Sequence, residues 1–179
     1  HNATTPLRAE VVEAMARVLR EIWGNPSSGH ALGAAARAEL EAARERVAAL
    51  VGFRPEEIVF TAGATEANNA VLAGALGGAP GHLVTTRTEP PSMLEPAAWR
   101  EGCGDKVTRL AVDGEGRLDP EAALAALTPE TRLVSILWAN NETGTIAPVE
   151  ALAGALAERG VPLHSDATQA LGKIEVDGE

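Results

Sequence analysis

Short apolar runs alternate with helical patterns along most of this chain, and this alternation constrains the fold more than any other feature. The runs expected to form strands are residues 58–60, 82–86, 107–112, 133–138, 161–165 and 174–176. The helical patterns cover residues 9–22, 31–51, 64–76, 92–101, 119–127 and 149–159. Strands separated by helices of about ten residues form βαβ units with right-handed crossovers. The pattern therefore predicts a three-layer α/β fold, with a mostly parallel sheet covered by helices on both faces.

Composition and charge exclude several classes of protein. An apolar content of 45% lets the chain bury a core, and a formal net charge of −10 disfavours binding to nucleic acid or to an anionic membrane. Cys103 is the single cysteine, so the sequence predicts no internal disulfide and no cysteine-rich zinc site. No run approaches the about 20 apolar residues of a membrane span, and no signal pattern opens the chain. We therefore expect a cytoplasmic protein without a metal site and without a nucleic-acid or membrane partner.

A turn of small residues opens the helix expected at 64–76. Residues 61–66 follow an apolar run and read Thr-Ala-Gly-Ala-Thr-Glu. Ligands of open α/β sheets bind beyond the carboxyl ends of strands, and the backbone N–H groups and the Thr65 hydroxyl of such a turn can hold a phosphate. An ordinary helix N-cap explains the same residues. A P-loop is excluded because no Gly-Lys-Ser/Thr follows, and no GxGxxG pattern is present.

Polar side chains also follow two later strands. Asn140 and Asn141 come after Trp138, where either a turn or a bound ligand accounts for them. Asp166 follows the strand expected at 161–165, either as a turn residue or as a carboxylate that keeps a heteroaromatic ring nitrogen protonated. A phosphate-binding turn, an amide and a carboxylate at one edge of a sheet describe a pyridoxal phosphate pocket better than a nucleotide pocket.

Five ordered motifs give the chain a resemblance to a known family. They are Ala3-Thr4-Thr5-Pro6, Gly24-Asn25-Pro26-Ser27-Ser28 with His30, Glu57-Ile58-Val59-Phe60-Thr61 with Gly63-Ala64-Thr65-Glu66, Asn140-Asn141-Glu142 with Gly144, and Asp166-Ala167-Thr168-Gln169 with Gly172-Lys173. In order and spacing they resemble the cysteine desulfurases, class V aminotransferase-like enzymes of the fold-type I pyridoxal phosphate superfamily. The resemblance covers essentially the whole chain and implies the large domain of a pyridoxal-phosphate-dependent transferase.

The resemblance also implies a reaction and a set of site residues. The cofactor is pyridoxal 5′-phosphate, and sulfur is removed from the substrate L-cysteine, giving L-alanine and an enzyme persulfide for iron–sulfur clusters or thio-cofactors. Ala64 and Thr65 match the phosphate-binding pair, and Asn141 lies near the phenolic oxygen of the ring. Asp166 matches the partner of the pyridinium nitrogen, and Gln169 matches a hydrogen-bond donor to the phenolic oxygen. The family is dimeric, which implies a homodimer for the parent enzyme, and its reaction leaves room for a sulfur-acceptor or scaffold protein.

The chain departs from the family at the residues that perform the chemistry. Where the family has a histidine stacked on the cofactor and thought to move protons, this chain has Pro90. The Schiff-base lysine and the persulfide cysteine of the family lie beyond Glu179. Lys106, Lys173 and Cys103 match neither of them. No catalytic residue is therefore assigned, and two alternatives stay open: another class V lyase or aminotransferase, such as a selenocysteine lyase, and a catalytically inactive homologue or fragment.

The two ends of the chain suggest a piece of a larger protein. The chain begins at His1 without a methionine and stops at Glu179, directly after a strand-like run. We expect a single truncated cofactor-binding large domain over 1–179, with an N-terminal arm and helix at 1–30 and an α/β core at 31–179. The small C-terminal domain of the family is expected to be absent.

Overall fold

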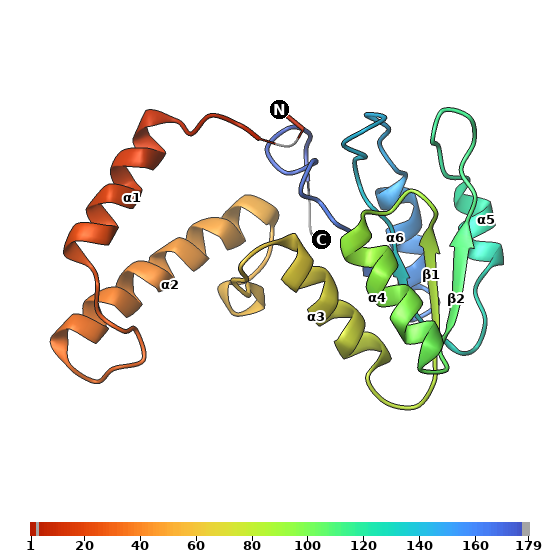
Figure 1. The fold of residues 1–179 in the computed structure, drawn as a ribbon, viewed down its shortest axis with the longest axis horizontal. Helices are drawn as coiled ribbons and strands as arrows, with labels where there is room; N and C mark the ends of the chain where they lie inside the picture. Colours follow the sequence, from red (N-terminus) through yellow and green to blue (C-terminus); the bar gives the residue numbers. More distant parts are fainter. Residues whose placement is uncertain (3, 177–179) are drawn as a thin grey trace. The chain divides into compact units, whose positions relative to one another are not determined.

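The described part of the chain forms two compact units. This computed structural model describes residues 1, 2 and 4–176. Ala3, where the first motif begins, and residues 177–179 lie outside the described residues. One unit comprises residues 1–60 together with Val176, and the other comprises residues 61–175 (Figure 1). The arm expected at 1–30 therefore shares a compact unit with the residues that follow it, up to residue 60.

Two helices of the first unit confirm the helices expected at 9–22 and 31–51. They are α1 (Ala9–Glu21) and α2 (Ala31–Val51). His30 caps the start of α2, because its ring Nδ1 accepts the backbone N–H of Gly33 at 3.3 Å. At the other end, α2 stops at Gly52, whose φ of 74° lies in the left-handed region that favours glycine. The sequence thus determines both ends of α2 by local contacts.

The first turn of α2 packs tightly against the loop before it. A Cβ atom at Gly33 would lie 2.3 Å from the carbonyl oxygen of Ser28 and 2.7 Å from that of Asn25. Only glycine allows the two backbones to approach so closely. A second contact links α2 to α1, where Nη2 of Arg17 donates to Oε1 of Glu39 at 2.6 Å.

The strand expected at the end of the first unit is wrong. After a short 3-10 helix, η1 (Pro55–Glu57), the chain is extended at Ile58 but pairs with no strand among the described residues. The guanidinium of Arg44 donates to the carbonyl of Ile58 and stands 5.1 Å from the ring centroid of Phe60. Val59 is 79% exposed. An apolar run alone does not supply the neighbouring strand that a ladder needs.

The second unit is built on a four-stranded parallel sheet. Its strands are β1 (His82–Thr86), β2 (Lys106–Leu110), β3 (Thr131–Ser135) and β4 (Leu163–His164). Their order is β2-β1-β3-β4, and every neighbouring pair is parallel. This topology confirms the predicted parallel α/β fold. The crossovers bring the carboxyl ends of all four strands to the same edge of the sheet.

Three strands differ in length from the sequence prediction. Strand β2 ends at Leu110, two residues early, because its ladder with β1 ends at the Thr86–Leu110 pair. Strand β3 ends at Ser135, yet the chain stays extended beyond it. The N–H of Trp138 donates to the carbonyl of Asp166 at 3.1 Å, so the β3 and β4 segments remain paired backbone to backbone past the short β4.

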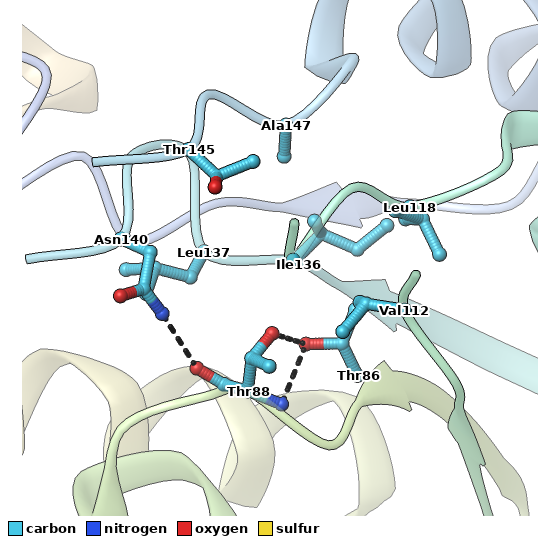
Figure 2. Close-up of a pocket in the computed structure, with 10 residues that line it drawn as sticks. Thr86, Thr88, Val112, Leu118, Ile136, Leu137, Asn140, Thr145 and Ala147 are labelled. Atoms are coloured by element: carbon cyan, nitrogen blue, oxygen red, sulfur yellow. Dashed lines mark hydrogen bonds between the residues drawn. The ribbon is translucent and has the colours of Figure 1, made fainter. Parts of the chain in front are cut away.

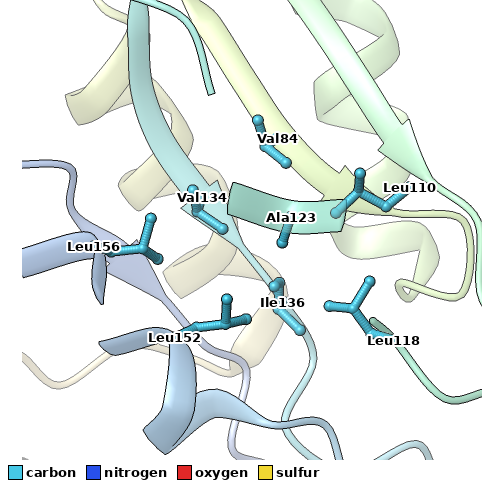
Figure 3. Close-up of a cluster of buried hydrophobic side chains, with 8 residues drawn as sticks. All are labelled: Val84, Leu110, Leu118, Ala123, Val134, Ile136, Leu152 and Leu156. Carbon is cyan, nitrogen blue, oxygen red and sulfur yellow. The ribbon is translucent and has the colours of Figure 1, made fainter. Parts of the chain in front are cut away.

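Helices cover both faces of this sheet, as predicted. They are α3 (Ala64–Leu76), α4 (Pro91–Gly102), α5 (Pro120–Ala125) and α6 (Val149–Ala157). The buried cluster that joins the sheet to α3 and α4 comprises Leu72, Leu76, Leu83, Met93, Ala97 and Leu133. The cluster that joins it to α5 and α6 comprises Val84, Leu110, Leu118, Ala123, Val134, Ile136, Leu152 and Leu156 (Figure 3). Consecutive residues of β1 therefore serve opposite cores, as the alternation of a buried strand requires.

The last expected strand, at 174–176, is also wrong. The N–H of Ile174 donates to the carbonyl of Ala170 at 3.0 Å, as in a turn, and Gly172 has a φ of 76°. Ile174 forms an isolated bridge with Leu171 and belongs to no ladder. The chain between Asp166 and Ile174 consists of tight turns, which leave no extended segment to pair.

Neither a membrane helix nor a metal cluster occurs in residues 1–2 and 4–176. No helix there is both long enough and apolar enough to cross a membrane. Nowhere in the same residues do three side chains of His, Cys, Asp or Glu gather as a metal ion would require.

Candidate functional site

A buried carboxylate, that of Asp166, lies just beyond the carboxyl end of β4. The residue is 9% exposed, and its backbone is held beside the β3 segment by Trp138. Both carboxylate oxygens accept hydrogen bonds. Oδ2 accepts from Nδ2 of Asn68 and Oδ1 accepts from the backbone N–H of Thr168, each at 3.0 Å. The structure thus places the predicted carboxylate at the sheet edge where ligands of α/β proteins bind.

The environment of Asp166 keeps its carboxylate ionised. Burial raises the pKa of Asp166. Hydrogen bonds from Asn68 and Thr168, together with the neighbouring His164 ring, lower it by more than burial raises it, so the pKa lies below its ordinary value of 3.8. None of the ion pairs found in the described residues includes Asp166. Neutral donors therefore account for the hydrogen bonds to this charge, and no ion pair of the described residues neutralises it.

Helix α3 brings the predicted phosphate turn to the same edge. Ala64 is its first residue, and Thr65 follows with its side chain exposed. The first N–H groups of a helix have no acceptor within it, so those of Ala64 and Thr65 are oriented to bind an anion. Asn68 lies three residues, about one helical turn, beyond Thr65. Because Asn68 bonds to Asp166, one turn of α3 connects the predicted phosphate turn to the predicted carboxylate.

Asn68 is a residue of the candidate site that the sequence interpretation missed. Its side chain is 2% exposed, and besides Asp166 it donates to Oγ of Ser92 on α4 at 3.0 Å. A signal for it exists in the sequence. Asn68, Leu72 and Leu76 recur every four residues along α3, so an amide occupies the buried stripe of that helix. A polar residue in such a stripe needs a buried partner.

The two neighbouring asparagines after β3 differ in their surroundings. Asn140 organises the loop, because its Oδ1 accepts the N–H groups of Glu142 at 2.9 Å and Thr143 at 3.0 Å. Asn141 lies in the exposed turn beside it. Gln169 lies in the turn three residues after Asp166 and accepts a hydrogen bond from the Lys173 ammonium. The chain thus carries Asn141 and Gln169 to the carboxyl edge of β3 and β4.

A small pocket opens at this edge between the ends of β1, β2 and β3. Nδ2 of Asn140 donates to the carbonyl of Thr88 at 3.2 Å, and the hydroxyls of Thr86 and Thr88 lie 3.1 Å apart, as Figure 2 shows. Threonine hydroxyls and an amide thus form the polar side of the pocket. Its apolar side is formed by Val112, Leu118, Ile136, Leu137 and Ala147.

Glu89 is a second buried carboxyl group near the same edge; it lies in the Thr88-Glu89 segment that precedes Pro90, and the sequence interpretation gave it no role. It is 5% exposed, and its Oε1 accepts from the Thr86 hydroxyl at 2.8 Å and from the Leu137 N–H at 2.9 Å. Burial, together with the negative charge of Asp166, outweighs the two hydrogen bonds, which lower the pKa of Glu89, so that its pKa is raised to about 7. Glu89 therefore changes its charge near neutral pH.

The residues considered for catalysis differ in their places: two lie at the opposite edge of the sheet from Asp166, one follows Asp166 in the chain, and Pro90 lacks the chemistry. Pro90 is the N-cap residue of α4, and its carbonyl accepts the N–H of Met93 at 2.9 Å. Lys106 begins β2 and Cys103 ends α4, so both belong to the opposite edge of the sheet. Lys173 lies in the turns after Asp166.

The pair formed by the α3 turn and Asp166 fits one class of ligand. Unpaired N–H groups at a helix start attract a phosphate, and an ionised, buried carboxylate attracts a protonated ring nitrogen. A cation such as Lys at the position of Asn68 would neutralise that carboxylate, and the chain has an amide there. The donor set is therefore suited to a small phosphorylated heteroaromatic ligand.

Comparisons with known proteins match this chain over its whole length. The family model described as aminotransferase class-V matches residues 1–179. The cysteine desulfurase IscS of Dictyoglomus turgidum is 44% identical over 178 residues, which are 98% of this chain and 45% of that protein. A cysteine desulfurase of Gluconacetobacter diazotrophicus is 45% identical over 181 residues, with 99% and 45% covered. The chain spans about half the length of the curated relatives it matches.

Solved structures extend this similarity to the fold. A NifS-like protein superposes with a TM-score of 0.94 at 38% identity, covering 99% of this chain and 50% of that one. A structure described as SspA in complex with cysteine gives a TM-score of 0.94 at 34% identity, with 98% and 52% covered. An apo cysteine desulfurase from Thermococcus onnurineus NA1 gives 0.89 at 31% identity, with 98% and 45% covered.

Proposed function

This chain belongs to the aminotransferase class-V family, and we propose that it forms the cofactor-binding part of a pyridoxal-phosphate-dependent cysteine desulfurase. The observation that carries the proposal is the buried, ionised carboxylate of Asp166, which neutral donors hold at the carboxyl edge of the sheet. The α3 turn, one helical turn from the Asn68 that binds this carboxylate, supplies the second half of the site.

The proposed site residues divide three tasks among them. When bound, pyridoxal phosphate supplies an electron sink that weakens the bonds at the α-carbon of an amino acid. Asp166 holds a proton on the ring nitrogen through its negative charge. The N–H groups of Ala64 and Thr65 and the Thr65 hydroxyl bind the phosphate. The amides of Asn141 and Gln169 donate to the phenolic oxygen, where neutral donors stabilise developing negative charge.

The proposed substrate is L-cysteine, and the products are L-alanine and a persulfide sulfur for iron–sulfur clusters or thio-cofactors. A neighbour whose structure is described as a complex with cysteine supports this choice. We place the protein in the cytoplasm, as a homodimer that passes sulfur to an acceptor or scaffold protein. The single cysteine and the net charge of −10 support the compartment and disfavour nucleic acid as a partner.

A second function is favoured by one residue. Pro90 stands where the family has a proton-moving histidine, and its ring has neither an ionisable group nor an aromatic face. This residue supports a homologue that binds the cofactor without desulfurase activity, or another class V lyase or aminotransferase. Alanine and sulfide release from L-cysteine, measured with the natural full-length protein and with its Pro90→His variant, separates these functions. Release that needs the histidine favours the inactive homologue, and release by the natural protein excludes it.

The binding of pyridoxal phosphate to this chain tests the cofactor site directly. Equilibrium dialysis should show binding by the wild-type chain and binding weakened about tenfold or more by Asp166→Asn, which removes the charge opposite the ring nitrogen. Asp119→Asn is the matched control, because Asp119 is the exposed N-cap of α5 and asparagine caps a helix equally well. Equal binding by the wild type and Asp166→Asn would contradict the proposal.

A further inference from the structure

The side-chain amide of Asn68 joins three elements of the second unit. It lies on α3, donates to Oγ of Ser92 on α4 at 3.0 Å, and donates to Oδ2 of Asp166 after β4 at 3.0 Å. With 2% of its surface exposed, this amide has little room to turn. The contact with Asp166 is a buried side-chain hydrogen bond between residues 98 positions apart.

The chemistry of its two partners determines how the amide is oriented. An ionised carboxylate only accepts hydrogen bonds, so the NH₂ end of Asn68 has to face Asp166. The hydroxyl of Ser92 accepts the second N–H and fixes the plane of the amide. The amide of Asn68, itself anchored by Ser92, therefore holds one oxygen of Asp166 in place, and the backbone N–H of Thr168 holds the other.

The amide of Asn68 is a neutral donor, and the charged groups near Asp166 show why this matters for the charge of the carboxylate. His164 faces it from β4, and Glu89, before α4, adds negative charge as it ionises. A lysine or arginine partner would stabilise the carboxylate by neutralising it. An amide stabilises the ionised form through a charge-assisted hydrogen bond and leaves the negative charge available to a cationic ligand atom.

We propose that Asn68 is a positioning residue, which orients the carboxylate of Asp166 and keeps it ionised toward a protonated ring nitrogen of the cofactor. This inference rests on the proposed function, because it assigns the cationic partner of Asp166 to pyridoxal phosphate. Asn68 itself acts through Asp166 and is not assigned a contact with the cofactor.

A carboxyl titration without cofactor tests the effect of Asn68 on Asp166. Carbon-detected NMR of the Asp166 carboxyl should show a higher pKa in Asn68→Ala than in the wild type, since the strongest side-chain donor is lost. Asn69→Ala is the matched control, because Asn69 is the exposed neighbour on α3 and bonds to the carbonyl of Thr65. It should leave the Asp166 titration unchanged. An Asp166 pKa that is the same in Asn68→Ala and the wild type overturns the proposal.

A second test uses the wild-type protein alone and therefore does not depend on the folding of a variant. The side-chain N–H resonances of Asn68 should shift with pH at the midpoint of the Asp166 carboxyl, because protonation of Asp166 weakens their hydrogen bond. The resonances of Asn69 should not follow that midpoint. A flat pH profile for the Asn68 amide also overturns the proposal.

Cofactor binding gives a readout that separates this inference from the proposed function. Equilibrium dialysis should show that the dissociation constant for pyridoxal phosphate rises about tenfold in Asn68→Ala and stays near the wild-type value in Asn69→Ala. An unchanged constant in Asn68→Ala, with clear binding by the wild type, counts against Asn68 alone. Absence of binding by the wild type counts against the proposed function, and a raised Asp166 pKa in Asn68→Ala then still supports the positioning of the carboxylate.

Discussion

Arg100 and Asp105 form the most shielded ion pair of the described residues, with 2.6 Å between Nε and Oδ2 and with side chains that are 15% and 1% exposed. The other oxygen of Asp105 accepts the N–H of Gly81 at 2.7 Å, and the guanidinium of Arg100 also donates to the carbonyl of Leu76. This pair therefore ties the ends of α3 and α4 to the start of β1.

Removal of the guanidinium should destabilise the second unit strongly. Arg100→Ala leaves the carboxylate of Asp105 buried without its partner, at a cost of about 3–5 kcal/mol in the free energy of unfolding. Arg117→Ala is the matched control, because it breaks the exposed pairs of Arg117 with Asp113 and Glu115. Urea denaturation should show a large loss for Arg100→Ala and a loss near experimental error for Arg117→Ala. Equal losses would contradict this interpretation.

Adjacent threonines on β1 should respond in opposite directions to the same substitution. The Oγ1 atom of Thr85 is fully buried, and no group among the described residues pairs with it. Thr85→Val removes this unpaired hydroxyl at nearly constant volume and should raise the free energy of unfolding by about 1 kcal/mol. Thr86→Val should lower it by about 1 kcal/mol or more, because the hydroxyl of Thr86 donates to Glu89. Thermal unfolding of both variants tests this difference. A loss of stability in Thr85→Val would show that the hydroxyl of Thr85 has a partner.

The stability of the second unit should depend on the protonation of Glu89. The unfolded carboxyl loses its proton near 4.5, and the folded one near 7, so the folded state binds more protons between these values. The stabilisation is complete below pH 4.5 and is lost as the pH rises through about 7, a change of about 3 kcal/mol. Glu89→Gln stays neutral, so its stability relative to the wild type should increase by that amount between pH 4.5 and 8.

Comparison of the variant with the wild type isolates Glu89 from the histidines. Burial lowers the pKa of His82 and of His164, which makes the stability fall on acidification below about 6.5, and both proteins share this effect. Chemical denaturation at several pH values supplies the measurement. Glu95→Gln, the same change at an exposed position of α4, is the control. Parallel pH profiles for Glu89→Gln and the wild type would argue against a raised pKa at Glu89.

Alanine should have opposite effects at two helical glycines. Gly33→Ala places a Cβ against the carbonyls of Ser28 and Asn25 and should destabilise the start of α2 by about 1–3 kcal/mol. Gly74→Ala, in open space on α3, should stabilise its helix by about 1 kcal/mol through higher helix propensity. Hydrogen exchange of the amides in each helix measures the two effects separately. Slower exchange at the start of α2 in Gly33→Ala would refute the close contact.

The sequence predicted those parts of the fold that depend on local patterns. The helices were found because periodicity and caps such as Asp119 act within a few residues. The apolar runs at 58–60 and 174–176 failed as strands because a ladder needs a partner, and local pattern does not reveal one. The sequence predicted Asp166 at the sheet edge because it directly follows a strand.

The parts of the site that were missed depend on tertiary contacts. Asn68 acquires its role from Ser92 and Asp166, which lie 24 and 98 residues further along the chain. Glu89 has its raised pKa because the folded chain buries it beside Leu137, 48 residues away. In the sequence, the only sign of Asn68 was an amide in line with two buried leucines, and Glu89 was noted only as the residue before Pro90.

The separation of Asn68 from Asp166 has a consequence for the order in which the chain assembles. A contact that closes a loop of 98 residues costs more chain entropy than one that closes 24, unless the intervening segment has already folded. We therefore expect α3 and α4 to associate early and the Asp166 contact to form among the last steps of folding, once β4 has joined the sheet. A newly made chain would then have its helices and most of its sheet before it has a site.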